Sequence, residues 1–542
     1  MTVAKVYTEG NVPLKVWTDS LEQGALEQAL HLTYLPFAFK QAAVMPDGHQ
    51  GYGMPIGGVL AARNVVVPYA VGVDIGCGVR AWKTGLKVEE FMPKRDEVMN
   101  LIQKTIPVGF HKHSVPSPLS WVEGSVPPSY DIPVVNREYE NSLVSLGTLG
   151  GGNHFIEVQA DEDDNVWAMI HSGSRNLGKQ VCDHYNKIAE ELNSRWHTKV
   201  PKEWQLAFLP MDSTEGQHYL MEMTLCLTFA KANRKHMMEA VDLALMSAGL
   251  STISPDPIDV HHNYAAKESW CGTCNSNRDS DSPLAARLLD DPVVSRVQGF
   301  LSGYRLSRHS CGGLLLRGAT SGLKLSPSQV GALEQMSLVL PNYFSECELT
   351  HNHFESFGLC ECADPVLFDE SCYNSSNKFG LGYAHLFGVE RDVRRLDRVL
   401  GSIFYGASSY DLDCQVHLHK TTPIIVHRKG AVKAVGTVLI PGSMGSHSYI
   451  GKGLESPESF KSCSHGAGRA MGRRAAIKAI EESDVLEEMK AADIGLYVSN
   501  SKGVAAESRQ SYHDIDVVMA NQSDLVEIMT KLRPLAVIKD VK

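Results

Sequence analysis

The chain has 542 residues, more than one hydrophobic core usually serves, and its 43% apolar and 21% charged residues exclude a disordered or fibrous protein. A formal net charge of −11 argues against indiscriminate electrostatic binding to nucleic acid, although a local basic groove is compatible with it. No apolar run approaches the roughly 18 to 20 residues of a membrane span, and the N-terminus lacks a basic region followed by an apolar one. We therefore expect a cytoplasmic protein that does not enter a membrane.

Local patterns along the chain predict both helices and strands. In chain order they predict a helix over residues 20–35, a strand over 59–67, one long or two abutting helices over 215–249, a strand over 435–440, and helices over 466–481 and 523–532. The elements alternate without a regular strand–helix period. This favours the α+β class over a doubly wound parallel sheet.

Residues 269–420 differ in character from the rest of the chain. They contain eight of the twelve cysteines, namely Cys271, Cys274, Cys311, Cys347, Cys360, Cys362, Cys372 and Cys414. The glycine-rich motifs fall in two blocks on either side, so we interpret the chain as a core in two parts, 1–268 and 421–542, with an inserted cysteine-rich domain. Helix-like pieces occur within it at 326–338 and 390–402.

Two interpretations fit the cysteines of this segment. Reduced, buried thiols are the favoured one, because a cytosolic protein rarely forms disulfides. The alternative is a structural zinc site formed by Cys271, Cys274, Cys360 and Cys362, with His351 or His353.

The segment Val73-Asp-Ile-Gly-Cys-Gly-Val79 combines a carboxylate and a thiol in a turn-forming stretch. Asp74 and Cys77 are three residues apart in a glycine-rich run, so a tight turn can direct both side chains at one centre. A thiolate with a carboxylate and nearby imidazoles suits a borderline divalent ion such as manganese, cobalt or zinc better than magnesium or calcium. The alternative for this motif alone is a buried turn with an inert cysteine.

Three histidines also occur in glycine- or asparagine-bearing motifs. His154 lies in GGGNHFIE, His171 in HSGSRNLG directly after an apolar run, and His262 in HHNY. Each one alone is more often a core or surface residue than a ligand, but together with Asp74 and Cys77 they indicate a metal centre. Two anionic ligands contribute about −2 and two divalent ions about +4, and the excess of about +2 suits a polyphosphate or a phosphate ester.

The C-terminal part carries the motifs HRKGA, PGSMG and SHGAGR. Gly466 and Gly468 allow backbone to approach a ligand closely, and the helix expected to begin there would direct its positive end at an anion. His465 is either a cap residue before that helix or a nucleophile that attacks a bound phosphate and forms a phosphoramidate.

The motifs MPDGHQGYGMPIGG, VGVDIGCGVR, GGGNHFIEV, HSGSRNLG, HHNYA, HRKGA, PGSMG and SHGAGR, in this order, closely resemble the RtcB family of RNA-splicing ligases. The resemblance covers the chain except residues 269–420, and the family has a much shorter link between HHNYA and HRKGA, so this segment looks like an insertion. Gly48 stands where the family often has valine.

The resemblance implies an RtcB-like mixed β-sheet core surrounded by helices. It also implies an enzyme that uses GTP and two manganese ions to join RNA ending in a 3′-phosphate or 2′,3′-cyclic phosphate to RNA with a 5′-hydroxyl. Such a reaction passes through a histidine–GMP intermediate and an RNA-(3′)pp(5′)G end. An archease-type activator is a further partner that the resemblance allows.

The resemblance also assigns roles to single residues. The guanylylated histidine falls on His465, and the metal ligands fall on Asp74, Cys77, His154, His171 and His262, with Cys77 bridging the two ions. Nucleotide contacts fall on Asn153, His154, Phe155, Ile156, Glu157, His262, Asn263, Pro441, Gly442, Ser443, Met444, Ser448, His465, Gly466, Ala467, Gly468 and Lys539. The Glu157 carboxylate suits guanine, because it can accept from the N1–H and N2–H donors and is repelled by the acceptors of adenine.

Arg175, Arg428 and Lys429 are expected to guide the RNA backbone, with solvated surface positions as the alternative. Two other functions stay open. The insertion begins soon after His262 and returns just before His427, so it could obstruct the site and leave a nucleotide- and metal-binding RNA-interaction protein. The same ions could instead serve a metal-dependent phosphoesterase acting on RNA ends. Retention of every expected ligand favours the ligase.

Overall fold

The computed structural model describes residues 3–117, 132–253, 255–270, 304–308, 314–318, 422–498 and 503–540. The chain divides into two compact units, one formed by Met1–Lys267 with Ile424–Lys542 and the other by Glu268–Pro423. Among the described residues, no helix combines the length and apolar character that crossing a bilayer requires.

The described strands of the second unit, β12 (Tyr304–Arg308) and β13 (Leu314–Gly318), pair antiparallel. The helices predicted at 326–338 and 390–402, and the cysteines considered for zinc, lie outside the described residues. Where the inserted domain begins and ends therefore stays a prediction.

The first unit contains two large sheets, consistent with the predicted α+β class. The six-stranded sheet has the order β1 (Lys5–Tyr7), β2 (Leu14–Val16), β3 (Ala38–His49), β4 (Ile56–Arg63), β14 (Thr422–Lys429) and β11 (Asn263–Trp270). The eight-stranded sheet has the order β10 (Ile258–His261), β6 (Gly78–Lys87), β8 (Asn165–Ser172), β7 (Phe155–Ala160), β20 (Val526–Lys539), β17 (Ser448–Leu454) and β16 (Val435–Ile440), with β19 (Gly495–Val498) parallel to β20. Both sheets thus join strands from the two parts of the core.

Shorter elements complete the unit. Two strand pairs are β5 (Val65–Val66) with β9 (Leu209–Pro210), and β15 (Ala431–Lys433) with β18 (Ser462–Ser464). The helices are α1 (Gln23–Thr33), α2 (Pro68–Val71), α3 (Val88–Phe91), α4 (Arg95–Thr105), α5 (Pro133–Ser145), α6 (Asn176–Arg195), α7 (Thr214–Ser247), α14 (Arg473–Ala479), α15 (Glu482–Ala491), α16 (Val504–Glu507) and α17 (Ile515–Asn521). Short 3₁₀ turns lie at Met92–Lys94, Lys202–Trp204, Pro457–Ser459 and Arg509–Ser511.

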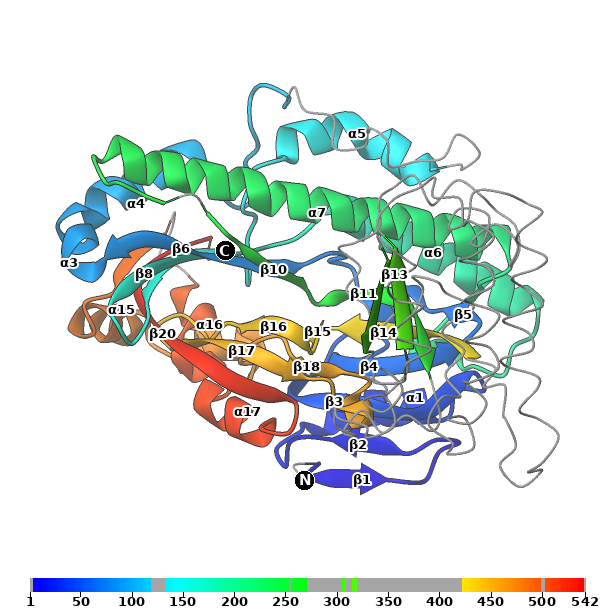
Figure 1. Cartoon of the computed structure of the whole chain (residues 1–542). Helices are drawn as coiled ribbons and strands as arrows, with labels where there is room; N and C mark the ends of the chain where they lie inside the picture. Colours follow the sequence, from blue (N-terminus) through cyan, green and yellow to red (C-terminus); the bar gives the residue numbers. More distant parts are fainter. Residues whose placement is uncertain are drawn as a thin grey trace, which may run out of the picture. The chain divides into compact units, whose positions relative to one another are not determined.

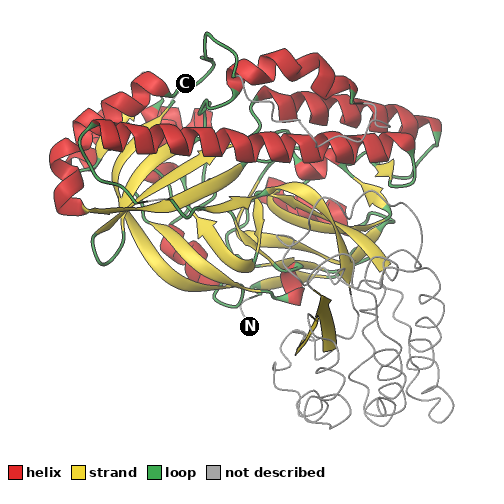
Figure 2. Ribbon diagram, turned by 45° about the horizontal axis from the view of Figure 1, so that its top comes forward, coloured by secondary structure: helices red, strands yellow, loops and turns green. Residues whose placement is uncertain are grey.

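Helix α7 lies over the eight-stranded sheet and packs on β6 and β8, as both views of the chain show (Figures 1 and 2). It begins at the Ser213 cap, whose Oγ accepts from the Gly216 N–H, and it is one helix of 34 residues. Its buried face includes Asn233 and Arg234 besides apolar side chains. Because buried polar groups need hydrogen-bond partners, these two side chains form hydrogen bonds with chain segments beneath the helix.

The pleat of β7 separates two cores. Ile156, Val158 and Ala160 point into the core that α4 and α7 cover, whereas Phe155 packs in the opposite core with Met444 and Val537. Alternation along the strand places Glu157 on the same face as Phe155. One face of this strand is therefore available to a site, and the other only stabilises the fold.

Several predicted elements are confirmed. The helix predicted at 20–35 is α1, the one at 215–249 is α7, and the strand predicted at 435–440 is β16. The strand predicted at 59–67 is two strands, β4 and β5, because Asn64 adopts a positive φ of 53° between them.

Two helix predictions are wrong. Residues 523–532 belong mostly to strand β20, because its backbone pairs with β17 on one side and β7 on the other, and this tertiary pairing overrides the local pattern. Residues 466–472 are irregular, and α14 begins only at Arg473. Gly468 has a φ of +68°, and a Cβ there would lie 2.3 Å from the Asp47 carbonyl oxygen, so the chain turns tightly instead of starting a helix. The positive end of a helix therefore does not lie directly after His465.

Candidate active site

One edge of the eight-stranded sheet gathers the predicted metal ligands. In the strand pairing Gly78 lies opposite both Ser172 and His261, and Phe155 lies opposite His171. Because neighbouring strands run antiparallel, the start of one strand lies beside the end of the next. The residues just before β6 and β7, near the end of β8 and just after β10 therefore meet at this edge.

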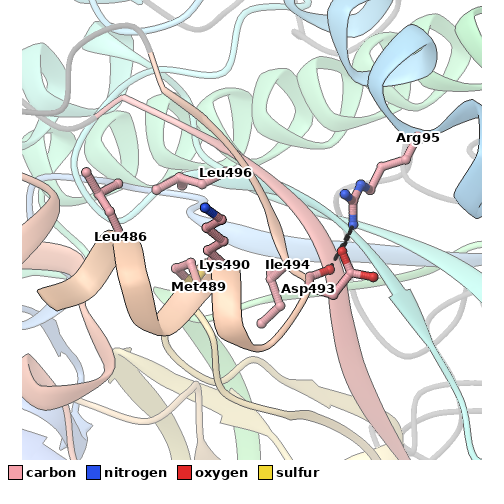
Figure 3. Close-up of a pocket in the computed structure, with 7 residues that line it drawn as sticks. All are labelled: Arg95, Leu486, Met489, Lys490, Asp493, Ile494 and Leu496. Carbon is pink, nitrogen blue, oxygen red and sulfur yellow. Dashed lines mark hydrogen bonds and ion pairs between the residues drawn. The ribbon is translucent and has the colours of Figure 1, made fainter. Parts of the chain in front are cut away.

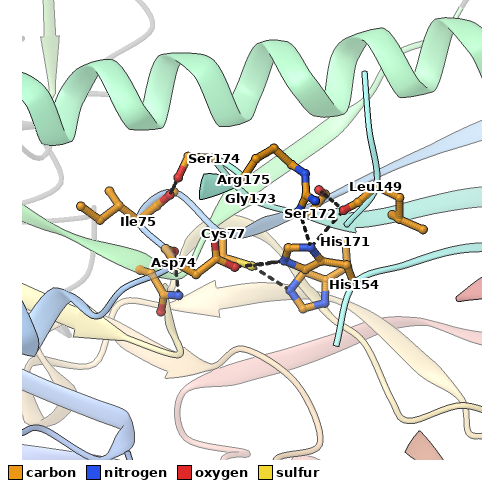
Figure 4. A network of polar contacts seen from close by, with 12 residues as sticks. Asp74, Ile75, Cys77, Leu149, His154, His171, Ser172, Gly173, Ser174 and Arg175 are labelled. Carbon is orange, nitrogen blue, oxygen red and sulfur yellow. Dashed lines mark hydrogen bonds and ion pairs between the residues drawn. The ribbon is translucent and has the colours of Figure 1, made fainter. Parts of the chain in front are cut away.

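Figure 4 shows four of the side chains that meet there, those of Asp74, Cys77, His154 and His171, in contact with one another. The Cys77 Sγ lies 3.4 Å from the His154 Nε2 and 3.2 Å from the His171 Nε2. The His154 Nε2 is also 3.0 Å from the Asp74 Oδ2, and the His171 Nε2 is 3.3 Å from the His262 Nε2. All five residues named from the sequence as metal ligands thus form one continuous cluster.

The cluster contains two groups of three potential ligands. One group is Cys77, His171 and His262, the other is Asp74, Cys77 and His154, and within each group the ligand atoms lie within 4.8 Å of one another. Cys77 belongs to both. A sulfur shared by two sets of ligands is the arrangement that a pair of ions with a bridging thiolate requires.

The protonation of the imidazoles leaves electron pairs directed inward. The His154 ring lies between two acceptors, with its Nδ1 3.0 Å from the Leu149 carbonyl oxygen and its Nε2 3.0 Å from the Asp74 Oδ2. Burial, with nearby imidazoles and Arg234, lowers the pKa values of His171 and His262 well below the ordinary value, so these rings are neutral. Among the described residues, the buried His262 Nδ1 has no hydrogen-bond partner. Neutral imidazoles whose electron pairs converge suit a cation.

The thiol and the carboxylate of the cluster also suit a bound cation. Burial and the adjacent Asp74 carboxylate raise the pKa of the Cys77 thiol well above its ordinary value, so a bound cation is needed to keep it a thiolate. For Asp74, burial acts to raise the pKa, but contacts with His154, Cys77 and Arg175 outweigh it and hold the pKa below its usual range. The donor set of one thiol, one carboxylate and three imidazoles fits a borderline divalent ion.

His465 lies beside this cluster, with its ring centroid 4.8 Å from that of His262. Its Nδ1–H donates to the Asp47 Oδ2 at 2.5 Å, and the same oxygen accepts from the backbone N–H groups of His465 at 3.0 Å and Gly466 at 3.3 Å. Asp47 is fully buried near the end of β3. The carboxylate therefore fixes the proton on Nδ1 and leaves the Nε2 electron pair free for attack.

If GTP labels His465, as the resemblance found in the sequence implies, replacing Asp47 by Asn is expected to slow that labelling on the order of 10²-fold. The amide can still accept from Nδ1–H, but it lacks the charge that stabilises the cationic ring formed after attack at Nε2. The rate is measured in a single turnover with radiolabelled GTP. Asp242→Asn, which alters a carboxylate bonded to the Trp82 Nε1, is the matched control and should label normally. Equal rates for Asp47→Asn and the wild type would remove this role from Asp47.

A second group of predicted residues forms a wall on the same side of β7. The Gln159 amide donates to the Glu157 Oε2 at 2.6 Å and to the Ser448 Oγ at 2.9 Å, so Glu157 and Ser448 lie close together. The Lys539 ammonium lies 5.6 Å from the centre of the Phe155 ring. An aromatic face, a carboxylate and a hydroxyl together are suited to a nucleobase.

Lys539 belongs to a cationic cluster around one buried carboxylate. Glu507 lies 3.1 Å from the Lys539 Nζ, 3.4 Å from Arg469 NH1 and 3.3 Å from the Arg473 Nε, and it accepts from the Tyr512 hydroxyl at 2.6 Å. Burial acts to raise the pKa of Glu507, but Lys539, Tyr512 and the arginines outweigh it and lower the pKa. One anion facing three cations leaves a local positive excess that suits a polyphosphate.

The loop from Pro441 to Met444 lies against the segment after His465. The Pro441 carbonyl accepts from the Ala467 N–H at 3.1 Å, and the Gly442 N–H donates to the Ser448 Oγ at 3.2 Å. The Ser443 Oγ lies 2.7 Å from the Ser446 Oγ, and Met444 is buried. These contacts connect the PGSMG and SHGAGR motifs to the wall that contains Ser448.

Two residues that were predicted to contact the nucleotide have other roles in the structure. Ile156 points into the opposite core, so only its backbone faces the site. The Asn263 amide donates to the Asp74 carbonyl at 3.0 Å, and its Oδ1 accepts from the Gly430 N–H at 2.7 Å, which links HHNYA to the metal loop and to HRKGA. By contrast, Asn153 is exposed beside the buried His154.

The glycines of GGGN make room for the protein's own side chains. A Cβ on Gly150, whose φ is +91°, would lie 1.8 Å from Arg175 NH1, and one on Gly151 would lie 2.7 Å from the Asp540 Oδ2. Arg175 NH1 lies 3.4 Å from the His154 Nδ1, and NH2 donates to the Gly109 carbonyl at 3.1 Å. Arg175 is thus beside the cluster, where a role in guiding RNA stays a prediction.

The prediction that Arg428 and Lys429 guide RNA is wrong. Arg428 is fully buried and donates to the Phe460 carbonyl at 2.8 Å and to the Ser462 Oγ at 2.9 Å. Lys429 is also buried, and its Nζ donates to the carbonyls of Tyr52 at 2.5 Å and Met54 at 2.9 Å. Both cations hold chain segments together, because their positions in β14 face the interior.

Other residues of the site are not predicted by the sequence patterns. Asp47 lies in the motif MPDGHQ, but nothing in that motif links it to His465, which is 418 positions away. Glu507 and Gln159 stand in segments without a recognisable motif. An acidic residue within a strongly patterned glycine-containing motif was the available signal for Asp47.

A cavity of about 220 Å³ lies elsewhere, between α4 and α15, and contains none of the predicted site residues. Its wall includes Leu486, Met489 and Ile494, and Arg95 NH1 bonds the Asp493 carboxylate at 3.0 Å (Figure 3). Its wall thus combines charged and apolar side chains. The cavity lies away from the cluster and carries no part of the site.

Comparison with known proteins agrees with the geometry. A family model described as tRNA-splicing ligase RtcB matches residues 28–125, 121–277 and 412–540. The RNA-splicing ligase RtcB of Escherichia coli strain K12 is 28% identical over 563 aligned residues, covering 99% of each chain. The tRNA-splicing ligase RtcB of Methanococcus maripaludis is 28% identical over 585 residues, with 98% of this chain and 94% of the relative covered.

The RNA-splicing ligase RtcB of Mycobacterium bovis is similar at 25% identity, with 94% of this chain and all of the relative covered. The family model leaves residues 278–411 unmatched, within the cysteine-rich segment. It matches the segments that hold Asp74, Cys77 and the clustered histidines, as well as His465. With well over half of its length matched by this one model, the chain belongs to the RtcB family.

Proposed function

We propose that this protein is a GTP-dependent RNA ligase. It joins RNA ending in a 3′-phosphate or a 2′,3′-cyclic phosphate to RNA with a 5′-hydroxyl. The observation that carries the proposal is the position of His465, whose Nδ1 is held by Asp47 and whose ring lies against His262 of the five-residue cluster. A nucleophile beside a site for divalent ions is what transfer of a nucleotidyl group requires.

The proposed metal ions are two manganese ions. Cys77, His171 and His262 would hold one, Asp74 and His154 the other, with the Cys77 thiolate shared. When bound, the ions would neutralise phosphate oxygens and stabilise the charge on the leaving group. The converging neutral imidazoles and the thiol support this proposal.

The first proposed step is attack of the His465 Nε2 on the α-phosphorus of GTP. A P–N bond forms, the bond to the β-phosphate oxygen breaks, and pyrophosphate leaves. Asp47 keeps the proton on Nδ1 and stabilises the positive ring that results. Lys539, Arg469 and Arg473, gathered around Glu507, add positive charge near the phosphates.

Two further transfers complete the reaction, after hydrolysis has opened any cyclic phosphate. An oxygen of the RNA 3′-phosphate attacks the guanylate phosphorus, the P–N bond breaks, and a pyrophosphate-linked RNA end forms. The 5′-hydroxyl of the second RNA then attacks the former 3′-phosphate, and GMP leaves. Activation is needed because a bare phosphate dianion repels the incoming oxygen and offers a poor leaving group.

We propose that Glu157 selects guanine. Burial raises the pKa of Glu157 to about 7, against the lowering effects of the Gln159 hydrogen bond and Lys539. Guanine N–H groups bind the ionised carboxylate, so kcat/KM for GTP labelling should rise as the pH increases through about 7. The protonated form, which dominates below that pH, offers a donor where an acceptor is needed.

Glu157→Gln is expected to remove this rise and to lower kcat/KM for GTP about 10- to 100-fold, because one amide N–H faces a guanine donor. The pH profile of labelling checks this directly. Glu162→Gln, a change of an exposed carboxylate five positions along, is the control and should keep the wild-type profile. An unchanged profile for Glu157→Gln would show that another group recognises the base.

We also propose that the cysteine-rich segment is a domain inserted into this ligase core. Strand β11, directly after His262, and strand β14, which contains His427, are neighbours in the six-stranded sheet. Neighbouring strands allow a chain to leave and re-enter a fold without breaking its core. The unmatched residues 278–411 support the same division.

One assay tests the function. The protein is incubated with a 2′,3′-cyclic-phosphate RNA, a 5′-hydroxyl RNA, GTP and Mn²⁺, and the RNA products are separated by size. A joined product that depends on GTP is expected. Hydrolysed ends without joining would indicate a phosphoesterase, and unchanged RNAs would indicate a binding protein. Either result would contradict the ligase proposal.

A further inference from the structure

Arg234 is a fully buried arginine on α7 that the proposed reaction does not use. Its NH1 donates to the Gly76 carbonyl at 3.0 Å and to the Ser172 carbonyl at 2.9 Å. Its Nε and NH2 donate to the two oxygens of Asp259 at 3.2 and 2.6 Å, and NH2 also lies 3.1 Å from the His261 Nδ1. All five N–H groups of the guanidinium therefore have an acceptor.

Three acceptors of Arg234 are sequence neighbours of the ligands of one metal group. Gly76 immediately precedes Cys77, Ser172 immediately follows His171, and His261 immediately precedes His262. Cys77, His171 and His262 are the three members of one metal group. A single planar guanidinium thus joins the backbone segments of all three, which come from three different parts of the chain.

The neighbouring side chain, Asn233, contacts both the end of β8, where its Nδ2 donates to the Ser172 Oγ at 3.2 Å and the Gly173 carbonyl at 3.3 Å, and a second loop. Its Oδ1 accepts from the N–H groups of Gly147 at 2.8 Å and Thr148 at 3.1 Å. The next residue, Leu149, is the one whose carbonyl accepts from the His154 Nδ1–H. Within the described residues, the hydrogen bonds of Arg234 reach none of residues 147–154.

We propose that Arg234 is a positioning residue for the metal site formed by Cys77, His171 and His262, and that in the site formed by Asp74, Cys77 and His154 it supports only the shared Cys77. This inference rests on the metal binding proposed above. Lysine in its place keeps the charge but offers three donors from one atom, which cannot span Asp259, two carbonyls and an imidazole. The two ions should therefore respond differently to this one substitution.

The test is a metal titration of the full-length protein after removal of ions by a chelator. Mn²⁺ binding is followed by calorimetry, and Co²⁺ binding by the absorption of the thiolate-to-cobalt charge transfer. The wild type is expected to bind two ions. Arg234→Lys should bind one ion about 10- to 100-fold more weakly, the usual loss when a group that orients a ligand is removed, and the other with a clearly smaller loss.

Arg80→Lys is the matched control, because Arg80 is also buried and its Nε donates to the same Asp259 carboxylate at 2.6 Å. It should bind both ions as the wild type does. Thermal unfolding of the ion-free proteins shows whether each variant is folded. His261→Ala removes only one partner of Arg234, and a smaller weakening of the same single ion is expected if Arg234→Lys does not fold.

The outcomes separate this inference from the proposed function. Two ions bound with wild-type affinities by folded Arg234→Lys, or by His261→Ala where Arg234→Lys does not fold, would overturn the inference and leave the ligase proposal standing. Equal weakening of both ions, or the same loss in Arg80→Lys, would also overturn it. A wild-type protein that binds no divalent ion would overturn this inference and the proposed metal centre together.

Discussion

His465→Ala is expected to abolish covalent labelling of the protein by radiolabelled GTP while the protein stays folded. The alanine removes the proposed Nε2 nucleophile, and the other histidines of the cluster are proposed metal ligands. Only His465 has its Nδ1 fixed by a buried carboxylate among the clustered histidines of the described chain. Labelling is measured after denaturing electrophoresis, and joining of RNA should be lost with it.

The control for this prediction is His236→Ala, which alters a partly exposed histidine of α7. It should label as the wild type does. A second test uses RNA that already carries the activated 3′ end, because this substrate does not need the histidine–GMP step. His465→Ala should still seal it. Label retained on His465→Ala would place the nucleophile elsewhere and contradict the mechanism.

Cys77→Ala is expected to remove both metal ions, because its sulfur belongs to both groups of ligands. Each group would keep two ligands, too few to hold a divalent ion firmly. Metal analysis after dialysis should find about two ions in the wild type and almost none in the variant. Addition of Mn²⁺ should raise the unfolding temperature of the wild type only, since a ligand stabilises the state that binds it.

Cys182→Ala is the matched control, because Cys182 is another free, fully buried cysteine, on α6. It should lose some packing stability and keep both ions. Metal binding should also weaken as the pH falls, because the thiol and imidazoles must be deprotonated to bind. A Cys77→Ala protein that retains two ions would show that the thiolate is not shared.

The fold was predictable where a periodic pattern and tertiary packing agree. Helix α7 followed from its apolar period, and β16 from its β-branched residues. Strand β20 was mistaken for a helix at its start, because pairing with β17, whose residues are far away in sequence, decides the conformation there. The segment after His465 was mistaken because Gly468 meets the Asp47 backbone, a contact no local pattern contains.

The candidate site was predictable to the extent that its residues stand in dense motifs. Asp74, Cys77, His154, His171 and His262 were named from sequence, and the strand register brings them together. Their supporting groups were not named, because the partner of Asp47 is 418 positions away, Arg234 lies in the middle of a helix, and Glu507 stands in a segment without a recognisable motif. Buried cations such as Lys429 were mistaken for surface groups, since charge alone does not tell which way a strand residue faces.

The most direct measurement is a crystal structure of the protein with Mn²⁺ and a GTP analogue that cannot be cleaved between its α- and β-phosphates. We expect two manganese peaks in the anomalous map, both bonded to the Cys77 sulfur, and the α-phosphorus in line with the His465 Nε2. A single ion, a Cys77 sulfur directed away from both, or a nucleotide whose phosphates lie far from His465 would contradict it.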